Sequence, residues 1–253
     1  MQKNLKKDAV FVLAAMVAFL VLLIFALPAA AAVSVYAEGA YTADDLVVYI
    51  YADIDTDAIC SAGVKLTYDS GVLSYSDVTP DDNPIAEKND EVWFMGDGST
   101  NYPYMNPEVA DGNVVFICGK LDTSTSTSPT DGVIGGRVLL GKVTFSIKDA
   151  PIETPVDNPE TTFGISVELG RGGDFANFVT TGGDKLDGSV DFTSIGTIVR
   201  ERGDANASGE ITSADMFKIR SMLASEEYIV YADCNDSGEI TSADMFCVRS
   251  KLH

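Results

Sequence analysis

Short apolar runs separated by polar turns dominate the middle of the chain, from Tyr41 to Val199. Apolar and polar residues alternate within most runs, and Gly, Asp, Asn, Ser or Pro stands between one run and the next. A period of two is typical of strands with one buried face. The predicted strands are residues 46–54, 63–68, 72–78, 91–95, 113–121, 137–147, 163–169 and 190–199. Because no convincing amphipathic helix separates them, they predict a β-sandwich.

The N-terminus follows a different pattern. Three lysines within the first seven residues precede an apolar run over residues 9–27, and a patch of small residues comes next. A basic segment, an apolar segment and small residues in this order are typical of a secretory signal sequence. We therefore expect a signal peptide over residues 1–37, cleaved after Ala37 or after Ala32. The apolar run is also long enough for an uncleaved membrane anchor, which is the alternative.

The C-terminal region contains an internal repeat. The ten residues from Ser208 to Phe217 recur without change 29 positions later, from Ser237 to Phe246. In each copy, apolar residues then follow at i, i+3 and i+7, which predicts a helix with one apolar stripe. These stripes consist of Met216, Ile219 and Leu223 in the first copy and Met245, Val248 and Leu252 in the second.

The segment around each repeat has the spacing of a calcium loop. When its first acid is counted as position 1, oxygen-bearing groups fall at positions 1, 3, 5, 7, 9 and 12, and a glycine that permits a sharp turn falls at position 6. Calcium takes six to eight oxygen ligands, so we expect two calcium ions, bound with dissociation constants of about 10⁻⁴ M. The predicted metal ligands are Asp204, Asn206, Ser208, Glu210 through its carbonyl, Thr212 and Asp215, and Asp233, Asn235, Ser237, Glu239, Thr241 and Asp244.

This pair of repeats resembles a dockerin, whose two loop-helix units lack the entering helix of an EF-hand and close each loop with Asp. The two copies depart from the family at position 5, where Ser208 and Ser237 replace the usual Asp. The resemblance implies calcium-dependent binding to a cohesin domain of another protein, in either of two orientations because the copies agree. The implied partner-binding residues are Ser213, Ala214, Arg220, Ser221, Ser242, Ala243, Arg249 and Ser250.

The preceding sandwich contains two stretches that resemble a cohesin, the jelly-roll module that receives dockerins. Residues 63–78 look like the third and fourth strands of a cohesin, and residues 138–147 resemble its seventh and eighth strands. The expected fold is therefore mostly β, with a jelly-roll sandwich over residues 40–199 and a small all-α dockerin over residues 200–253. We expect a very short linker between them, which would allow the modules to pack together.

Cysteine and aromatic residues leave alternatives open. Neighbouring third and sixth strands in a cohesin imply either a Cys60–Cys118 disulfide or two buried thiols. A local bridge between Cys234 and Cys247 also stays open, since connectivity cannot be deduced from sequence. The aromatic residues of one segment fit either a sugar-stacking platform or packing inside the sandwich; they are Trp93, Phe94, Tyr102 and Tyr104.

The composition of the chain excludes several classes of partner and of catalytic site. A formal net charge of −21 argues against nucleic acid or an anionic membrane as partner. The sole histidine is His253, which excludes a Ser/His/Asp triad and a zinc site built from histidines. We expect a noncatalytic extracellular adaptor in a cellulosome-like, polysaccharide-degrading complex, with the sandwich binding a dockerin-bearing protein. The alternatives are a carbohydrate-binding sandwich tethered through a dockerin and a self-associating surface or matrix protein.

Overall fold

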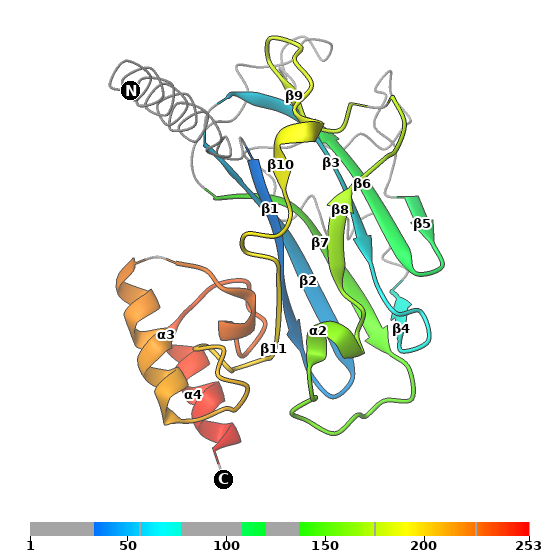
Figure 1. Cartoon of the computed structure of the whole chain (residues 1–253). Helices are drawn as coiled ribbons and strands as arrows, with labels where there is room; N and C mark the ends of the chain where they lie inside the picture. Colours follow the sequence, from blue (N-terminus) through cyan, green and yellow to red (C-terminus); the bar gives the residue numbers. More distant parts are fainter. Residues whose placement is uncertain are drawn as a thin grey trace, which may run out of the picture. The chain divides into compact units, whose positions relative to one another are not determined.

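The described strands form two β-sheets (Figure 1), and a cluster of buried apolar side chains lies between them. The computed structural model describes residues 33–55, 57–76, 108–119, 137–174, 176–225 and 227–252. The described residues belong to one compact unit, Ala32–His253, and residues 1–31 lie outside them. The predicted strand over residues 91–95 and most of the predicted signal sequence also lie outside them.

The first sheet has the strand order β10-β1-β2-β7-β4, and β11 also pairs with β1. Both β10 and β11 run parallel to β1, whereas the other neighbouring strands are antiparallel. The strands are β1 (Val33–Tyr41), β2 (Asp45–Ile54), β4 (Leu73–Tyr75), β7 (Arg137–Ile147), β10 (Val190–Asp191) and β11 (Thr197–Glu201).

The second sheet has the order β5-β6-β3-β8, and β9 also pairs with β3. All its described pairings are antiparallel, including the β3–β6 pair that the cohesin resemblance implied. Its strands are β3 (Ile59–Thr67), β5 (Glu108–Ala110), β6 (Asn113–Gly119), β8 (Ser166–Leu169) and β9 (Val179–Thr180), and the short helices α2 (Pro159–Thr162) and η3 (Asp187–Ser189) lie in the connections.

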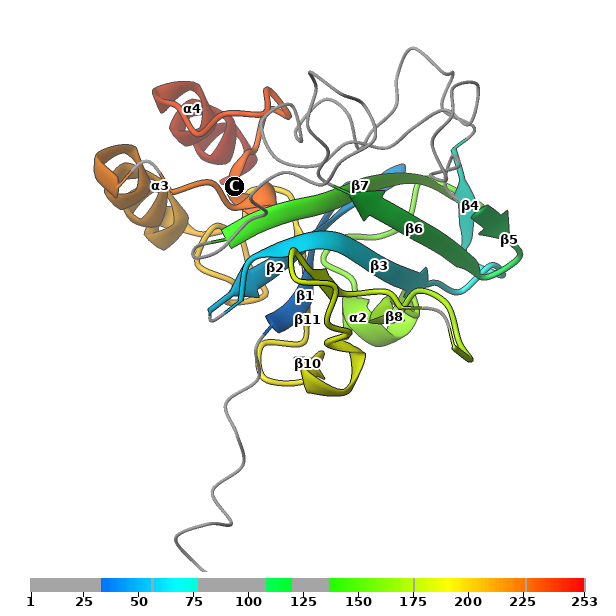
Figure 2. The same cartoon turned by 90° about the horizontal axis from the view of Figure 1, so that it is seen from above.

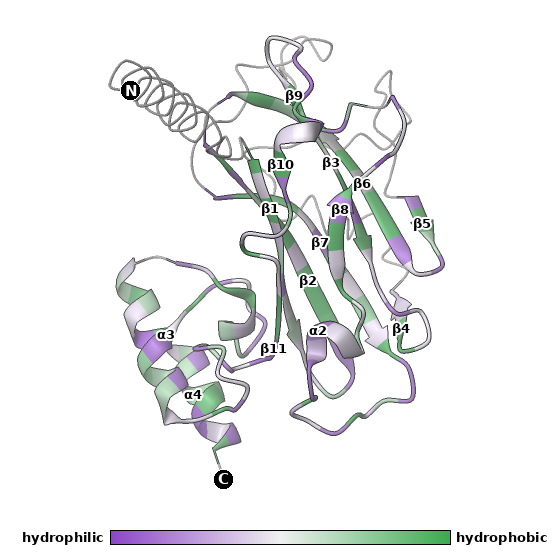
Figure 3. Cartoon of the chain, in the orientation of Figure 1, coloured by the Kyte–Doolittle hydropathy of each residue, from purple (hydrophilic) through white to green (hydrophobic). Residues whose placement is uncertain are grey.

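The strand β2 is buried on both faces. Its inward residues, such as Val48 and Ile50, pack in the core between the sheets with 0% exposure. Its outward residues Val47, Tyr49 and Tyr51 are also buried, but belong to a second apolar cluster. Figure 3 shows the apolar residues along β1 and β2 in green. An apolar run without strict alternation is typical of a strand covered on both sides.

Three strand boundaries differ from the predictions. The strand β1 begins at Val33, inside the segment predicted as signal peptide, so the sandwich starts before the predicted residue 40. Residues 138–147 belong to the single strand β7 instead of two strands. A register shift between Ile50 and Tyr51 of β2 marks a β-bulge in the β2–β7 pair, in which residue 140 is the extra residue and the chain continues as one strand. The predicted strand over residues 190–199 is divided into β10 and β11.

Residues 204–252 form what we call the loop-helix module. It contains α3 (Ser213–Ser225), η4 (Val230–Ala232) and α4 (Ser242–Lys251), and α3 and α4 lie side by side (Figure 2). Its apolar side chains form one cluster with the outer face of β1 and β2. The members contributed by the module include Ile219, Met222, Val230, Tyr231 and Val248, and those contributed by the sandwich include Tyr36, Ala40, Val47, Tyr49 and Tyr51.

The predicted linker at residues 200–203 is part of this packed structure. The strand β11 extends to Glu201, and Arg202 N donates to the carbonyl of Tyr41 on β1 at 2.8 Å. Gly203 N then donates to the carbonyl of Tyr231 in the module at 2.7 Å. The chain therefore passes from the last strand of the sandwich into the first loop without a free connecting segment.

Candidate functional site

The two loops of the module have the same backbone conformation. Position 4 is left-handed in both, with φ of 56° at Ala207 and 56° at Asp236. The glycines at position 6 have φ of 91° at Gly209 and 81° at Gly238, a region that side chains with a Cβ rarely adopt. The repeated sequence thus specifies the same turn twice.

The acid at position 1 organises the front of each loop. In the first loop, Asp204 accepts hydrogen bonds from Ser208 N at 2.9 Å and Gly209 N at 2.7 Å. In the second loop, Asp233 accepts from Ser237 N at 3.0 Å and Gly238 N at 2.7 Å. The amide oxygen at position 3, from Asn206 or Asn235, accepts from the same serine amide in each case.

The acid at position 12 closes each loop and begins the following helix. Asp215 accepts from Asn206 N at 3.0 Å and from Thr212 N at 2.7 Å. Asp244 accepts from Asn235 N at 3.2 Å and from Thr241 N at 2.8 Å, and Thr241 forms a capping box with it. Asp244 therefore both closes the second loop and caps the start of α4.

The carboxylates of the two loops are buried. Asp204 is 1% exposed, and Asp215, Asp233 and Asp244 are 0% exposed. Burial raises the pKa of Asp204 and of Asp233, the hydrogen bonds from the loop amides oppose this, and the second carboxylate of the same loop raises the pKa further. Two buried carboxylates in one loop are electrostatically unfavourable unless a cation accompanies them.

The donor set of each loop fits a hard divalent cation. It consists of oxygen alone, from two carboxylates, an amide, hydroxyls and a backbone carbonyl, which are the ligand types that calcium prefers. Within the described residues, no three His, Cys, Asp or Glu side chains gather in one place. A cation held here would therefore depend on the neutral oxygens as much as on the carboxylates.

The predicted partner-binding residues lie on the surface of the two helices. All eight are exposed: Ser213, Ala214, Arg220, Ser221, Ser242, Ala243, Arg249 and Ser250. The prediction missed Phe217 and Phe246, which occupy the same repeat position and are 69% and 67% exposed. Large exposed aromatic side chains are informative about where a partner could bind, because burial would be favourable for them. Their identical placement in the repeat was the signal available in the sequence.

Polar contacts connect the module to the sandwich and to the segment between them. The Tyr228 hydroxyl donates to Asp233 Oδ2 at 3.2 Å, and Arg202 Nη1 lies 2.6 Å from Asp236 Oδ1 in the second loop. On the sandwich, Arg137 Nη1 donates to the Tyr228 carbonyl at 2.6 Å, while its guanidinium lies 3.6 Å from the ring centroid of Tyr51. Arg202 therefore contacts the second loop directly, and Arg137 of the sandwich contacts Tyr228, the residue that bonds to the first acid of that loop.

The cysteines give one correction. Cys60 is a free thiol whose Sγ lies within 3.5 Å of the carbonyls of Val179 and Thr180, so the predicted Cys60–Cys118 bridge is wrong. Ala62, not Cys60, lies opposite Cys118 in the β3–β6 ladder. A residue two positions away along a strand is a diagonal neighbour at about 7–8 Å, beyond the usual Cα separation of a disulfide.

The cysteines of the module do form a disulfide. Cys234, next to the first acid of the second loop, is bonded to Cys247 on α4, which resolves the alternative that the sequence left open. The first copy has Ala205 and Lys218 at the corresponding positions, so only the second loop is cross-linked to its helix.

Two other predictions, the sugar platform and the alternative membrane anchor over residues 9–27, fall outside what the structure describes. The aromatic residues considered as a sugar platform, Trp93, Phe94, Tyr102 and Tyr104, lie outside the described residues. Among the helices of the described segments, none has the length and apolar character needed to span a membrane.

Comparisons with known proteins complete the description. No family model matches the chain, and no curated protein matches it. The solved structures to which the chain is similar include cohesin modules. The sixth cohesin of scaffoldin B from Acetivibrio cellulolyticus, solved in complex with a Cel5 dockerin, is 18% identical, with 64% of this chain and 94% of that chain covered and a TM-score of 0.36.

A type III cohesin module from the cell-surface anchoring scaffoldin ScaE of Ruminococcus flavefaciens is 12% identical, with 65% of this chain and 85% of that chain covered and a TM-score of 0.35. The seventh ScaB type I cohesin from Pseudobacteroides cellulosolvens is 16% identical, with 66% of this chain and 85% of that chain covered and a TM-score of 0.32. Similarity at this level does not establish family membership, and the two-sheet architecture rests on the strand pairing described above.

Proposed function

We propose that the chain is a noncatalytic extracellular adaptor whose loop-helix module binds calcium and then docks onto a cohesin-type domain of another protein. The observation that carries this proposal is the duplication of one hydrogen-bonded loop with two buried carboxylates in each copy. In this proposal Asp204 and Asp215 hold one calcium ion, and Asp233 and Asp244 hold the second. Calcium supplies the positive charge that lets these carboxylates stay ionised while buried.

The docking face consists of the exposed helix residues that the two copies share. Phe217 and Phe246 supply the large apolar contacts, and the serines and arginines around them supply hydrogen bonds and charge. Aromatic and arginine side chains are the residue types that contribute most to protein interfaces. The loops fix the start of α3 and α4, so calcium determines how this face is presented to the partner.

The sandwich has two roles in this adaptor. It supports the module through the shared apolar cluster on β1 and β2, and it receives a dockerin-bearing protein, which gives the adaptor its second end. The cohesin-like stretches of its sequence support the second role. Head-to-tail association of the chain with its own copies is the competing outcome, and would appear as calcium-dependent growth in mass.

The test uses the secreted chain immobilised and exposed to proteins secreted by its source organism, in calcium and in chelator, with captured proteins identified by mass spectrometry. We expect cohesin-bearing proteins only in calcium. The double variant Asp215→Asn with Asp244→Asn should lose them but keep dockerin-bearing proteins, because only the module end is disabled. The matched control, Asp111→Asn with Asp174→Asn, removes the same charge from exposed residues outside the loops.

Thermal unfolding must first show that the loop variant remains folded. Retention of cohesin-bearing proteins by a folded loop variant would refute the calcium mechanism. If neither the original chain nor the control captures dockerin-bearing proteins, the receptor role of the sandwich is refuted, and the role of the module is unaffected.

A further inference from the structure

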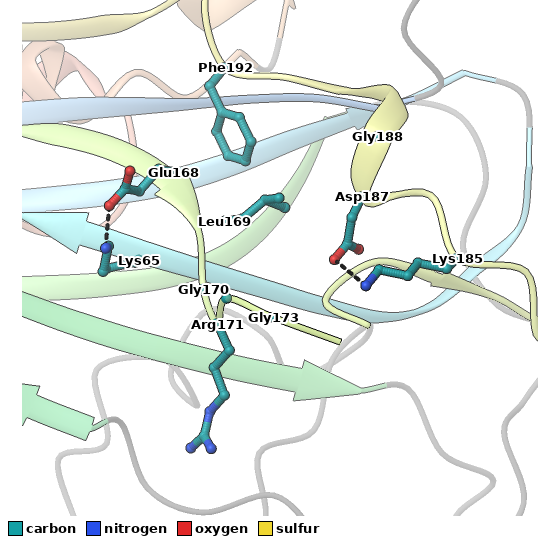
Figure 4. Close-up of a pocket in the computed structure, with 11 residues that line it drawn as sticks. Lys65, Glu168, Leu169, Gly170, Arg171, Gly173, Lys185, Asp187, Gly188 and Phe192 are labelled. Atoms are coloured by element: carbon teal, nitrogen blue, oxygen red, sulfur yellow. Dashed lines mark ion pairs between the residues drawn. The ribbon is translucent and has the colours of Figure 1, made fainter. Parts of the chain in front are cut away.

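A second candidate site lies on the sandwich, apart from the calcium loops. It is an open pocket of about 650 Å³, bordered by β3, β8, the glycine-rich turn after β8 and η3. In Figure 4, Lys65 and Glu168 stand on one side of the pocket and Lys185 and Asp187 on the other, with Leu169 between them. Phe192 completes the lining (Figure 4). The volume lies within the range of about 300–1,000 Å³ that is usual for small-molecule sites.

The charges that line the pocket are paired. Lys65 forms an ion pair with Glu168, Lys185 lies 3.6 Å from Asp187, and Arg171 lies 3.5 Å from Glu108. The pocket therefore offers ammonium and guanidinium donors next to carboxylate acceptors, with little net charge of its own. Such a lining suits a ligand with groups that both donate and accept hydrogen bonds, as hydroxyl groups do, better than an ion of either sign.

One side of the pocket is held rigidly. Asp187 accepts hydrogen bonds from the backbone amides of Asn177 at 3.0 Å and Phe178 at 2.8 Å. Burial opposes ionisation of Asp187, but these hydrogen bonds outweigh it and hold the pKa of the carboxyl below its usual value. An acceptor fixed in this way loses little conformational freedom when a ligand binds.

Four of the lining residues are glycines, and the structure explains only two of them. A Cβ on Gly170 would lie 2.8 Å from backbone atoms of β3, and Gly173 has φ of +74°. Among the residues that the structure describes, a Cβ on Gly172 or Gly188 would meet no atom within 4 Å, and neither glycine has a left-handed φ. Neither packing nor backbone conformation requires glycine there. Glycine also serves where a ligand approaches the backbone closely, and that explanation fits Gly172 and Gly188.

We propose that this pocket binds a neutral oligosaccharide built of pyranose rings. The two ion pairs bind ring hydroxyl groups, the backbone at Gly172 and Gly188 lies against the sugar, and Phe192 with Leu169 contacts the apolar C–H face of a ring. This goes beyond the adaptor role, because it adds contact with a polysaccharide to contacts with proteins. It also differs from the platform considered in the sequence, since it uses none of those aromatic residues.

The experiment is an NMR titration of the ¹⁵N-labelled secreted chain in calcium with cellotetraose, xylotetraose and maltotetraose, and separately with trigalacturonate. We expect at least one neutral oligosaccharide to shift the amide signals of Gly172 and Gly188 at millimolar concentration. Gly188→Ala should weaken that binding at least tenfold without lowering the melting temperature, because the added methyl group meets open space in the free protein. Glu168→Gln should also weaken it, by removing an acceptor.

Gly182→Ala is the matched control, because its Cβ makes only ordinary contacts at 3.5 Å and 3.6 Å and the residue is outside the pocket lining. Three results would overturn the proposal: no shift at these amides with any neutral oligosaccharide, binding of trigalacturonate alone, or unchanged affinity in Gly188→Ala. None of these results depends on whether a cohesin-bearing protein binds the module, so the two proposals can fail separately.

Discussion

The hydroxyl group of Tyr228 donates a hydrogen bond to Asp233 Oδ2 at 3.2 Å, and the ring of Tyr228 lies 5.9 Å from that of Tyr49 on β2. One side chain thus touches both the first acid of the second loop and the outer face of the sandwich. The first loop has no such contact from the repeat, since Val199 occupies the corresponding position 29 residues earlier.

Tyr228→Phe is therefore expected to weaken calcium binding in the second loop alone. The substitution keeps the ring against Tyr49 but removes the hydroxyl group, and with it the hydrogen bond that orients Asp233 and the one shared with Tyr49. Loss of a contact that orients a metal ligand typically lowers metal affinity about tenfold or more. Calorimetric titration with calcium should then resolve two sites of different affinity, with the first loop as the internal control. Equal weakening of both sites would show that the tyrosine acts on the module as a whole.

Tyr51→Ala is expected to loosen the module as well as destabilise the chain. Tyr51 is 6% exposed, stacks on Tyr36 with ring centroids 5.7 Å apart, and carries the Arg137 guanidinium. Removing a buried aromatic side chain costs about 3–5 kcal/mol. Because the cavity opens on the face of β2 that meets the module, amides of α3 and α4 should exchange with solvent faster.

Hydrogen exchange measured by mass spectrometry checks this expectation. Phe217→Ala is the control, since its side chain is 69% exposed and surface substitutions usually change stability by less than about 0.5 kcal/mol. Unchanged exchange in α3 and α4 of the Tyr51 variant would mean that the module is stable without support from the sandwich.

The repeats account for what could be predicted locally. The hydrogen bonds inside each calcium-type loop join residues within nine positions of each other, so a twelve-residue pattern suffices to specify its turn. The helix stripes were only partly correct. Ile219 is 0% exposed as predicted, but Leu223 is 40% exposed and Met222 is buried instead. Met222 belongs to the apolar cluster that the module shares with the outer face of the sandwich, and a repeat cannot encode a distant partner of this kind.

The missed strand and the incorrect disulfide have the same kind of cause. β1 was hidden because it follows an alanine-rich segment and is buried on both faces, which removes the alternation that marks a half-buried strand. The Cys60–Cys118 prediction used the correct strand pair but could not fix the register, which places Cys118 opposite Ala62. Strand register depends on side chains from across the sheet and is only weakly encoded in one strand.

Single substitutions of Phe217 and Phe246 should separate one binding mode from two. If the partner binds the module in either of two equivalent orientations, one substitution removes one orientation and halves the affinity, whereas the double substitution removes both. Each exposed aromatic side chain should contribute about 2 kcal/mol if it lies at the centre of the interface, so the double variant should bind roughly thirtyfold more weakly. Surface plasmon resonance with the captured cohesin domain measures this. A large loss from one single variant alone would establish a single orientation.

The start of β1 predicts where the mature protein begins. Val33 and Val35 are 0% and 1% exposed, and the segment 33–37 pairs with β2 along its whole length. Cleavage after Ala32 keeps β1 whole, whereas cleavage after Ala37 would remove five of its nine residues. Burial of a valine side chain contributes about 1.5–3 kcal/mol to the free energy of unfolding. The loss of two valines would therefore remove a large part of a typical total stability of about 5–15 kcal/mol.

We therefore expect the secreted protein to begin at Val33, which N-terminal sequencing of material from the source organism would detect. Two recombinant chains provide the physical comparison: one beginning at Val33 should unfold cooperatively, and one beginning at Glu38 should be strongly destabilised or fail to fold. A natural N-terminus at Glu38 on a folded protein would mean that β1 is dispensable and that another segment completes the sheet beside β2. Agreement between the natural N-terminus and the stable recombinant chain would place the signal boundary at the first residue of the sandwich.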